Sequence, residues 1–157
     1  MSGGSGRTAV FVGAVVVKRD AVLLVRQSPG HPLAGQWTVP WGRVEDGESP
    51  AAAALRETWE EGGVRAEVEG LLGVQELPSP QQGGIALVYL CSHAGGEPAP
   101  RDRETDAAGY YTRAQLDALR EPLEPWSAWL VRRVLSGRFT LTRPQPGNPL
   151  GGKFSFL

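Results

Sequence analysis

The chain has 157 residues, of which 41% are hydrophobic and 21% charged, a composition typical of one globular domain. Its formal net charge of −1 leaves room for a nucleotide-sized ligand but argues against a protein that follows a polynucleotide backbone, so we expect no polynucleotide partner. Cys91 is the one cysteine, which excludes an intramolecular disulfide and a cysteine metal cluster. The longest apolar run, residues 9–17, is too short to cross a bilayer, and the first residues lack a signal-peptide pattern. We therefore expect a cytoplasmic protein without membrane contact.

Strands dominate the beginning of the chain. Residues 9–17 and 21–27 are rich in valine and leucine and predict two strands joined by a hairpin turn. Residues 28–36 contain two prolines and two glycines, which is typical of a loop, and residues 37–40 predict a short strand.

A helix is predicted between Ser49 and Gly62. Ser49 offers a hydroxyl that caps the free amides of the first turn, and Pro50 suits the first helical position. Gly62 and Gly63 form a stop signal. The apolar residues on one face, which we expect to pack in the core, are Ala52, Leu55 and Trp59.

The second half of the chain is expected to alternate strands, loops and helices. In order, we expect one or two strands over residues 64–77, a loop over 78–84, a central strand over 85–91, a long loop over 92–106, a strand ending at Thr112, a helix from Thr112 to Leu119 and a helix over 124–135. The last helix is expected to direct Trp126 and Trp129 inward. Residues 1–8 are expected to be flexible, residues 9–136 to form one domain, and residues 137–157 to form an extended tail.

Three glutamates share one face of the helix predicted after Ser49. Glu57, Glu60 and Glu61 stand at positions i, i+3 and i+4, within one turn. Three like charges so close repel one another, and a solvated helix rarely needs that arrangement. Hard divalent cations prefer oxygen ligands such as carboxylates. The cluster therefore predicts a site for Mg²⁺ or Mn²⁺.

The residues around this cluster follow a longer pattern at fixed spacing. The matching residues are Gly42, Glu48, Arg56, Glu57, Glu60, Glu61, Gly63 and Val64. The pattern resembles that of the Nudix hydrolase family, which includes MutT-like proteins and ADP-ribose pyrophosphatases. Trp41 departs from it, because the family usually has a glycine there, and Thr58 stands at a place that is more often aliphatic. The resemblance implies an α/β class and the Nudix fold, a mixed β-sheet sandwiched between α-helices.

The resemblance also implies roles for individual residues. The implied metal ligands are the carbonyl of Gly42 and the carboxylates of Glu57, Glu60 and Glu61. Glu48 and Arg56 are expected to form a pair that supports the site. The candidate catalytic residues are Glu57, Glu60 and Glu104. The base that activates water is either Glu57 or Glu104, which lies on a distant loop.

The implied activity is hydrolysis of the diphosphate linkage in a nucleoside diphosphate joined to another group, with ADP-ribose or a nucleotide sugar favoured. Trp41 and Pro80 are the candidate substrate contacts, Pro80 because ADP-ribose pyrophosphatases have a similarly placed proline. The alternatives are a nucleoside triphosphate pyrophosphohydrolase, acting on ordinary or oxidised nucleotides, and a nucleotide-sensing domain without catalysis. The position of Cys91 disfavours a third option, an isoprenoid diphosphate isomerase. The phosphorus attacked and the oligomeric state, including a homodimer, are left open.

Overall fold

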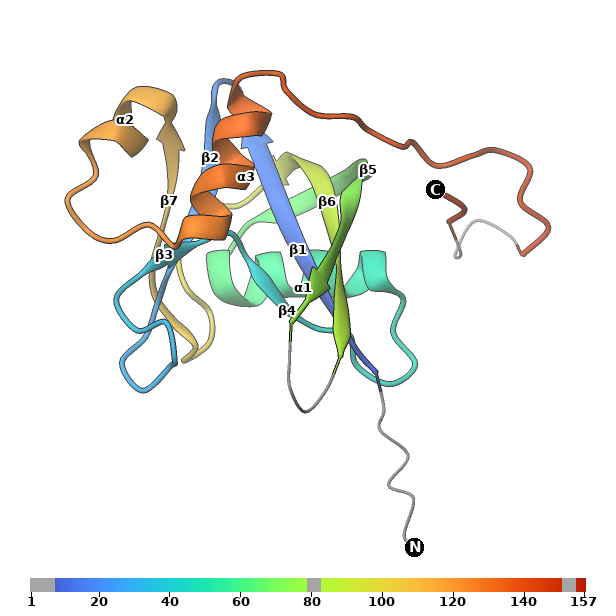
Figure 1. Cartoon of the computed structure of the whole chain (residues 1–157), viewed down its shortest axis with the longest axis horizontal. Helices are drawn as coiled ribbons and strands as arrows, with labels where there is room; N and C mark the ends of the chain where they lie inside the picture. The colour runs from blue at the N-terminus through green and yellow to red at the C-terminus, as the bar shows by residue number, and fades with distance from the viewer. Residues whose placement is uncertain (1–7, 79–82, 151–154) are drawn as a thin grey trace, which may run out of the picture.

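A mixed β-sheet lies between helices in the computed structural model, which describes residues 8–78, 83–150 and 155–157 (Figure 1). The strands are β1 (Ala9–Lys18), β2 (Ala21–Gln27), β3 (Trp37–Thr38), β4 (Trp41–Arg43), β5 (Arg65–Leu77), β6 (Gly84–Gly95) and β7 (Thr105–Thr112). The helices are α1 (Pro50–Gly62), α2 (Arg113–Ala118) and α3 (Pro125–Leu135). These elements confirm the predicted α/β class and the sheet sandwiched between helices.

The centre of the sheet is the parallel pair of β1 and β6. The strand order is β3-β2-β1-β6-β5, with β4 paired to β1 and β7 paired to β2, and these other pairings are antiparallel. Two strands share one edge of β1, because β4 pairs with its residues 11–13 and β2 with its residues 17–18. This sharing lets the short strand β4 reach α1, which it contacts.

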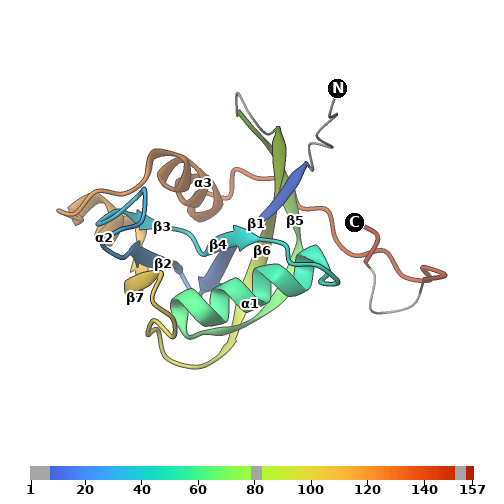
Figure 2. The ribbon, with the colours of Figure 1, turned by 90° about the horizontal axis from the view of Figure 1, so that it is seen from below.

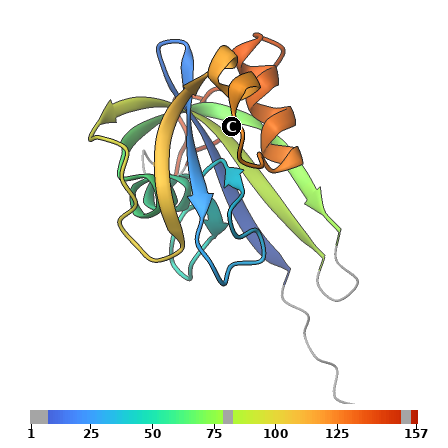
Figure 3. The ribbon, with the colours of Figure 1, turned by 90° about the vertical axis from the view of Figure 1, so that its left-hand side faces the viewer.

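Helix α1 covers one face of the sheet, and α2 and α3 cover the other (Figure 2). Successive side chains of a strand point to opposite faces. Val15 of β1 accordingly packs in the core on the α3 side, whereas Ala14 and Val16 pack in the core on the α1 side. Figure 3 shows the same layers from the side, with strands between α1 and α3. The sheet therefore has two hydrophobic cores, one under each helical layer.

The predicted signals at both ends of α1 are confirmed. The Ser49 side chain accepts a hydrogen bond from the Ala52 amide at 3.2 Å, and Pro50 is the first helical residue. At the other end Gly63 adopts a left-handed conformation, φ 70°, and its amide donates to the Trp59 carbonyl at 2.9 Å. These caps set the length and the rotation of the helix that carries the glutamates.

The inward face of α1 differs from the prediction. Leu55 is partly buried and packs against the core as expected, but Ala52 is exposed and Trp59 is partly buried outside the core, so the expectation is wrong for these two residues. The residues buried in this helix are Ala53, Ala54, Glu57, Thr58, Glu61 and Gly62. The small residues let the helix lie close to the sheet, and Glu57 and Glu61 share this buried face with them. A search for apolar positions alone does not detect buried carboxylates.

The prediction for Trp129 is also wrong, because its side chain is 55% exposed. Leu130, Val131 and Val134 form the buried face of α3 instead. Trp126 is partly buried, and its ring nitrogen donates a hydrogen bond to the Gln75 side chain at 3.0 Å. The apolar residues of α3 therefore extend beyond the buried face of the helix, and Trp129 lies on the surface.

Strands β6 and β7 extend further than predicted. The expected loop over residues 92–106 is shorter, because β6 continues to Gly95 and β7 begins at Thr105. The extension of β6 pairs with the first residues of β5 through the backbone, which does not require apolar side chains. Strand β4 was not predicted at all. Its three residues carry no pattern of their own and become a strand by pairing with β1.

The C-terminal segment crosses strand β5. Beyond α3 the described residues form no further helix, and Thr142 makes an antiparallel bridge with Leu71 through hydrogen bonds of 2.8 and 2.9 Å. Leu157 packs against the core on the α1 side. In the part of the chain that the structure describes, every helix is too short or too polar to span a membrane.

Gly63→Ala should destabilise the protein by about 2–3 kcal/mol, because an alanine there is strained and its Cβ would overlap the backbone of Ala99. Gly137→Ala is the matched control. Gly137 has a similar φ of 68°, but a Cβ there meets nothing within 4 Å, so the strain alone should cost about 1 kcal/mol. Urea unfolding of both variants measures the difference. Equal losses would contradict the close packing of residue 99 on the end of α1.

Candidate active site

Helix α1 and strand β4 bring a backbone segment against two carboxylates. Glu57 and Glu61 lie one turn apart on the buried face of α1 and are 6% and 2% exposed. Gly42 of β4 lies so close to Glu57 that a Cβ on residue 42 would overlap the carboxylate. A glycine is therefore required at position 42 if the backbone is to lie beside Glu57, as the sequence pattern implies.

A third carboxylate comes from the loop between β6 and β7. Carboxylate oxygens of Glu57, Glu61 and Glu104 all lie within 4.8 Å of one another. The loop is held against the end of α1, because the amides of Ala99 and Arg101 donate to the carbonyls of Gly62 and Glu60 at 2.9 and 2.8 Å. The loop candidate predicted from the sequence is thus placed next to the helix cluster.

Trp59 contributes to this docking, although it does not lie in the core. The guanidinium carbon of Arg101 lies 4.1 Å from the centre of the indole ring, and that of Arg65 lies 5.2 Å from it. Cations placed over an indole are attracted by its quadrupole. The sequence pattern did not indicate these partners, because Arg65 and Arg101 lie on different segments that meet only in the fold.

Arg56 forms the predicted pair with Glu48 and makes further contacts. Its Nε and Nη2 donate to the two Glu48 oxygens at 2.8 and 3.1 Å. Nη2 also donates to the carbonyl of Arg43 at 3.0 Å. Nη1 donates to Glu57 at 2.8 Å and to Glu60 at 3.1 Å. The guanidinium therefore ties α1 to β4 and to the loop that joins them.

Glu60 occupies a different environment from Glu57 and Glu61. Its side chain is 41% exposed and pairs with Arg56. Glu60 does not belong to the group of three carboxylates described above. Its expected roles as a metal ligand and catalytic residue stay predictions.

The electrostatics of the enclosed carboxylates are unfavourable without a cation. Burial and the neighbouring Glu57 carboxylate raise the pKa of Glu61 well above its ordinary value. Burial also raises the pKa of Glu57, although its hydrogen bond from Arg56 opposes this. Hydrogen bonds from Arg56 lower the pKa of Glu48, so that carboxylate stays ionised.

The chemistry of this donor set fits a hard divalent cation. One oxygen of Glu61, Oε2, is buried and has no hydrogen-bond partner among the described residues. Such an orphaned buried acceptor is costly, and a cation bound there would satisfy it. Glu57, Glu61 and Glu104 offer oxygen ligands within one ion's reach, and the backbone of Gly42 lies alongside. The residues present thus match the preference of Mg²⁺ and Mn²⁺ for oxygen.

A cavity of about 290 Å³ is lined by residues of β1, β5 and the start of α3 together with Trp41 of β4, and none of Gly42, Glu57, Glu61 and Glu104 lines it. Trp41, the neighbour of Gly42, lines it together with Phe11, and the two ring centres are 6.0 Å apart. Gln75, Glu124 and Trp126 line the cavity opposite them. The candidate Pro80 lies outside the described residues.

Cys91 is buried in β6, and burial raises the pKa of its thiol to about 12. A thiol in that state is a poor nucleophile. It packs in the core on the α1 side and does not belong to the group of Glu57, Glu61 and Glu104. Cysteine catalysis of the isomerase type therefore has no support here.

Comparison with known proteins assigns the family. Residues 7–134 match the model of the NUDIX domain, which is most of the chain, and the protein therefore belongs to the Nudix family. It is 39% identical over 88 residues to a MutT-like protein of Streptomyces ambofaciens, covering 56% of this chain and 54% of the relative. It is 35% identical over 91 residues to the ADP-ribose pyrophosphatase of Methanocaldococcus jannaschii, covering 57% and 53%.

A solved structure supports the same assignment. The MutT NUDIX hydrolase from Burkholderia pseudomallei superposes with a TM-score of 0.68 at 30% identity, covering 82% of this chain and 98% of that one. The chain spans only about half the length of the two curated relatives named above. This protein thus shares its family and its fold with these relatives, but the comparisons do not identify its substrate.

Proposed function

We propose that this protein is a metal-dependent pyrophosphohydrolase that cleaves the diphosphate linkage of a nucleoside diphosphate joined to another group. The observation that carries the proposal is the group of three carboxylates, of which Glu57 and Glu61 are buried, with an unpartnered oxygen on Glu61. Hydrolysis of a diphosphate builds negative charge on phosphoryl oxygens, and a bound Mg²⁺ or Mn²⁺ would neutralise that charge.

The proposed ligands of the cation are the carboxylates of Glu57, Glu60 and Glu61 and the carbonyl of Gly42. We assign the role of general base to Glu104. Its side chain is exposed and close to the other two carboxylates, whereas Glu57 is held by Arg56. Glu104 would accept a proton from water as the water oxygen bonds to phosphorus and the bridging P–O bond breaks. Arg56 and Glu48 would keep α1 and β4 in register.

The substrate we favour is ADP-ribose or a nucleotide sugar. The cavity beside β4 offers Trp41 and Phe11 for stacking on a base, and it adjoins the strand whose backbone lies against Glu57. The name of the Methanocaldococcus relative also favours ADP-ribose. A nucleoside triphosphate is the second candidate, since the Streptomyces and Burkholderia relatives are named for MutT.

A panel of nucleoside diphosphate derivatives and triphosphates, assayed with Mg²⁺ and Mn²⁺, tests the proposal. We expect a nucleoside monophosphate as one product from the preferred substrate. Hydrolysis in ¹⁸O-labelled water then identifies the phosphorus attacked, because the label appears in the product formed at that atom. Nucleotide binding without any product would instead favour a sensing domain.

Trp41→Ala should raise KM for the preferred substrate about tenfold and change kcat less, because base stacking contributes to binding rather than to the reaction. Phe156→Ala is the control, since Phe156 is exposed and does not line the cavity. Steady-state kinetics of both variants on the same substrate give the comparison. Equal KM values for Trp41→Ala and the unchanged protein would exclude Trp41 as a substrate contact.

A further inference from the structure

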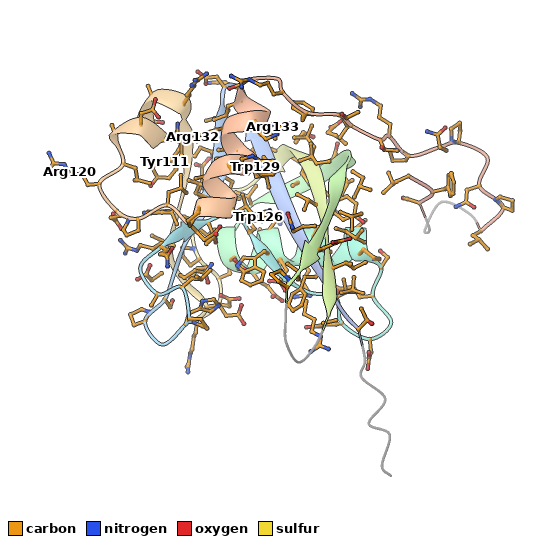
Figure 4. The ribbon with its side chains drawn as sticks, in the orientation of Figure 1. Tyr111, Arg120, Trp126, Trp129, Arg132 and Arg133 are labelled. Carbon is orange, nitrogen blue, oxygen red and sulfur yellow. The ribbon has the colours of Figure 1, made fainter. Side chains whose placement is uncertain are left out.

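Guanidinium groups gather where α2 begins and α3 ends, far from the carboxylate cluster in the sequence. A hollow of about 330 Å³ is lined by Arg113, Trp129, Arg132, Arg133, Ser136 and Arg138. Figure 4 shows Trp126, Trp129, Arg132 and Arg133 in succession along α3. We call the surface formed by Arg113, Trp129, Arg133 and Arg138 the α3 surface.

The positive charge of this surface is largely uncompensated. Arg132 pairs with Asp117 at 2.5 Å. Arg113, Arg133 and Arg138 have no ion pair with any carboxylate in the described part of the chain. Like charges held together destabilise a surface unless an anion neutralises them. The α3 surface therefore complements a ligand with more than one negative charge.

Exposed rings accompany these charges. Trp129 is 55% exposed, and the guanidinium of Arg133 lies 5.0 Å from the centre of one of its rings. Phe139 is 39% exposed and lines an adjoining hollow together with Trp129 and Arg133. Aromatic faces beside arginines are the usual platform for unstacked bases with their phosphates.

The hollows connect the α3 surface to the cavity beside β4. The hollow lined by Trp129 and Arg133 has a volume of about 210 Å³. It shares Gln75 and Trp126 with the cavity that contains Trp41. A chain that leaves this cavity can therefore follow α3 past Trp126 and Trp129 to the arginines.

We propose that the α3 surface binds a single-stranded polynucleotide whose 5′ end enters the cavity beside β4. The phosphates contact Arg113, Arg133 and Arg138, and a base stacks on Trp129. The assignment of the 5′ end rests on the proposed function, because the cleaved diphosphate lies at that end. The net charge of −1 led us to expect no polynucleotide, but that sum does not describe where the charges lie.

Fluorescence anisotropy with a dodecauridylate labelled at its 3′ end tests the proposal, using the full chain in EDTA and a series of salt concentrations. We expect affinity that falls with salt and a dissociation constant at least about tenfold higher in Arg133→Glu/Arg138→Glu. Trp129→Ala should raise it at least about fivefold. Arg143→Glu is the control, since Arg143 is exposed and pairs with Glu69 on the C-terminal segment, and it should change the constant less than about twofold.

Several outcomes would overturn the proposal. These are the absence of binding at low salt, an equal loss in the Arg143 control, or equal binding of a poly-glutamate peptide without any effect of Trp129→Ala. The last would assign the surface to acidic peptides. Binding in EDTA needs no catalysis, so a failed hydrolysis panel leaves this test intact. If hydrolysis does occur, Arg133→Glu/Arg138→Glu should leave kcat/KM for ADP-ribose unchanged and lower it for a 5′-triphosphorylated oligonucleotide.

Discussion

Glu61→Gln should lower kcat by about 10²- to 10⁴-fold while the protein stays folded. Glutamine keeps the volume of the side chain but removes the charge that would hold a cation. Glu61 is 2% exposed and close to Glu57 and Glu104, so its ionised form is destabilised by burial and by repulsion. The free energy of unfolding without metal should therefore be equal or slightly higher in the variant.

Metal titration of the thermal unfolding temperature distinguishes this explanation from simple misfolding. Metal that binds only the folded state adds about 2.7 kcal/mol of stability at a hundredfold excess over its dissociation constant. We expect Mg²⁺ or Mn²⁺ to raise the Tm of the unchanged protein and to raise that of Glu61→Gln much less. Glu67→Gln is the control, because Glu67 is exposed on β5. Full turnover by Glu61→Gln across the substrate panel would refute the proposed mechanism.

Arg56→Met should destabilise the protein by about 3 kcal/mol, because it removes the cation from a network of carboxylates. The side chain of Arg56 is only 22% exposed and that of Glu57 is 8% exposed, so water cannot replace the lost hydrogen bonds to Glu57. Activity should also fall, by about 10- to 100-fold, since Glu57 and β4 lose the group that holds them together. Urea unfolding and steady-state kinetics measure the two effects.

The matched variant is Arg132→Met, which breaks an exposed ion pair with Asp117 and should cost less than about 1 kcal/mol. Arg56→Lys should be intermediate, because an ammonium keeps the charge but cannot reproduce the forked contacts to Glu48. High Mg²⁺ should recover part of the stability of Arg56→Met by neutralising Glu57. A loss no larger than that of Arg132→Met would show that the network is not needed for stability.

Local features of the sequence were enough to predict the helix that carries the site. A capping serine, a proline and a terminal glycine specify where α1 begins and ends, and all three act within a few residues. The pair of Arg56 with Glu48 followed from the resemblance to a spaced motif, and the structure contains it. The first two strands were predictable for the same reason, because a run rich in valine and leucine is a local feature of the sequence.

Orientation and long-range pairing were not predictable in this way. Trp59 and Trp129 were assigned to the core on hydrophobicity, but Trp59 packs with two arginines from other segments and Trp129 stays exposed. Strand β4 forms because β1 offers it a free edge. Such features depend on contacts between segments far apart in the chain, which no local pattern records.

The amino-acid pattern was enough to predict a helix with closely spaced glutamates, and its resemblance to a spaced motif implied the α/β class and the roles of Gly42, Glu48 and Arg56. The spacing of Glu57, Glu60 and Glu61 along a helix is enough to place the three residues within one turn. The approach of Glu104 to Glu57 and Glu61 follows from the fold, because docking of its loop on the end of α1 sets that distance. The fold also brings several arginines together on one surface beside Trp129. The formal net charge of the whole chain does not reveal this local positive charge. Proximity in space between distant segments follows from packing, and packing is a property of the whole fold.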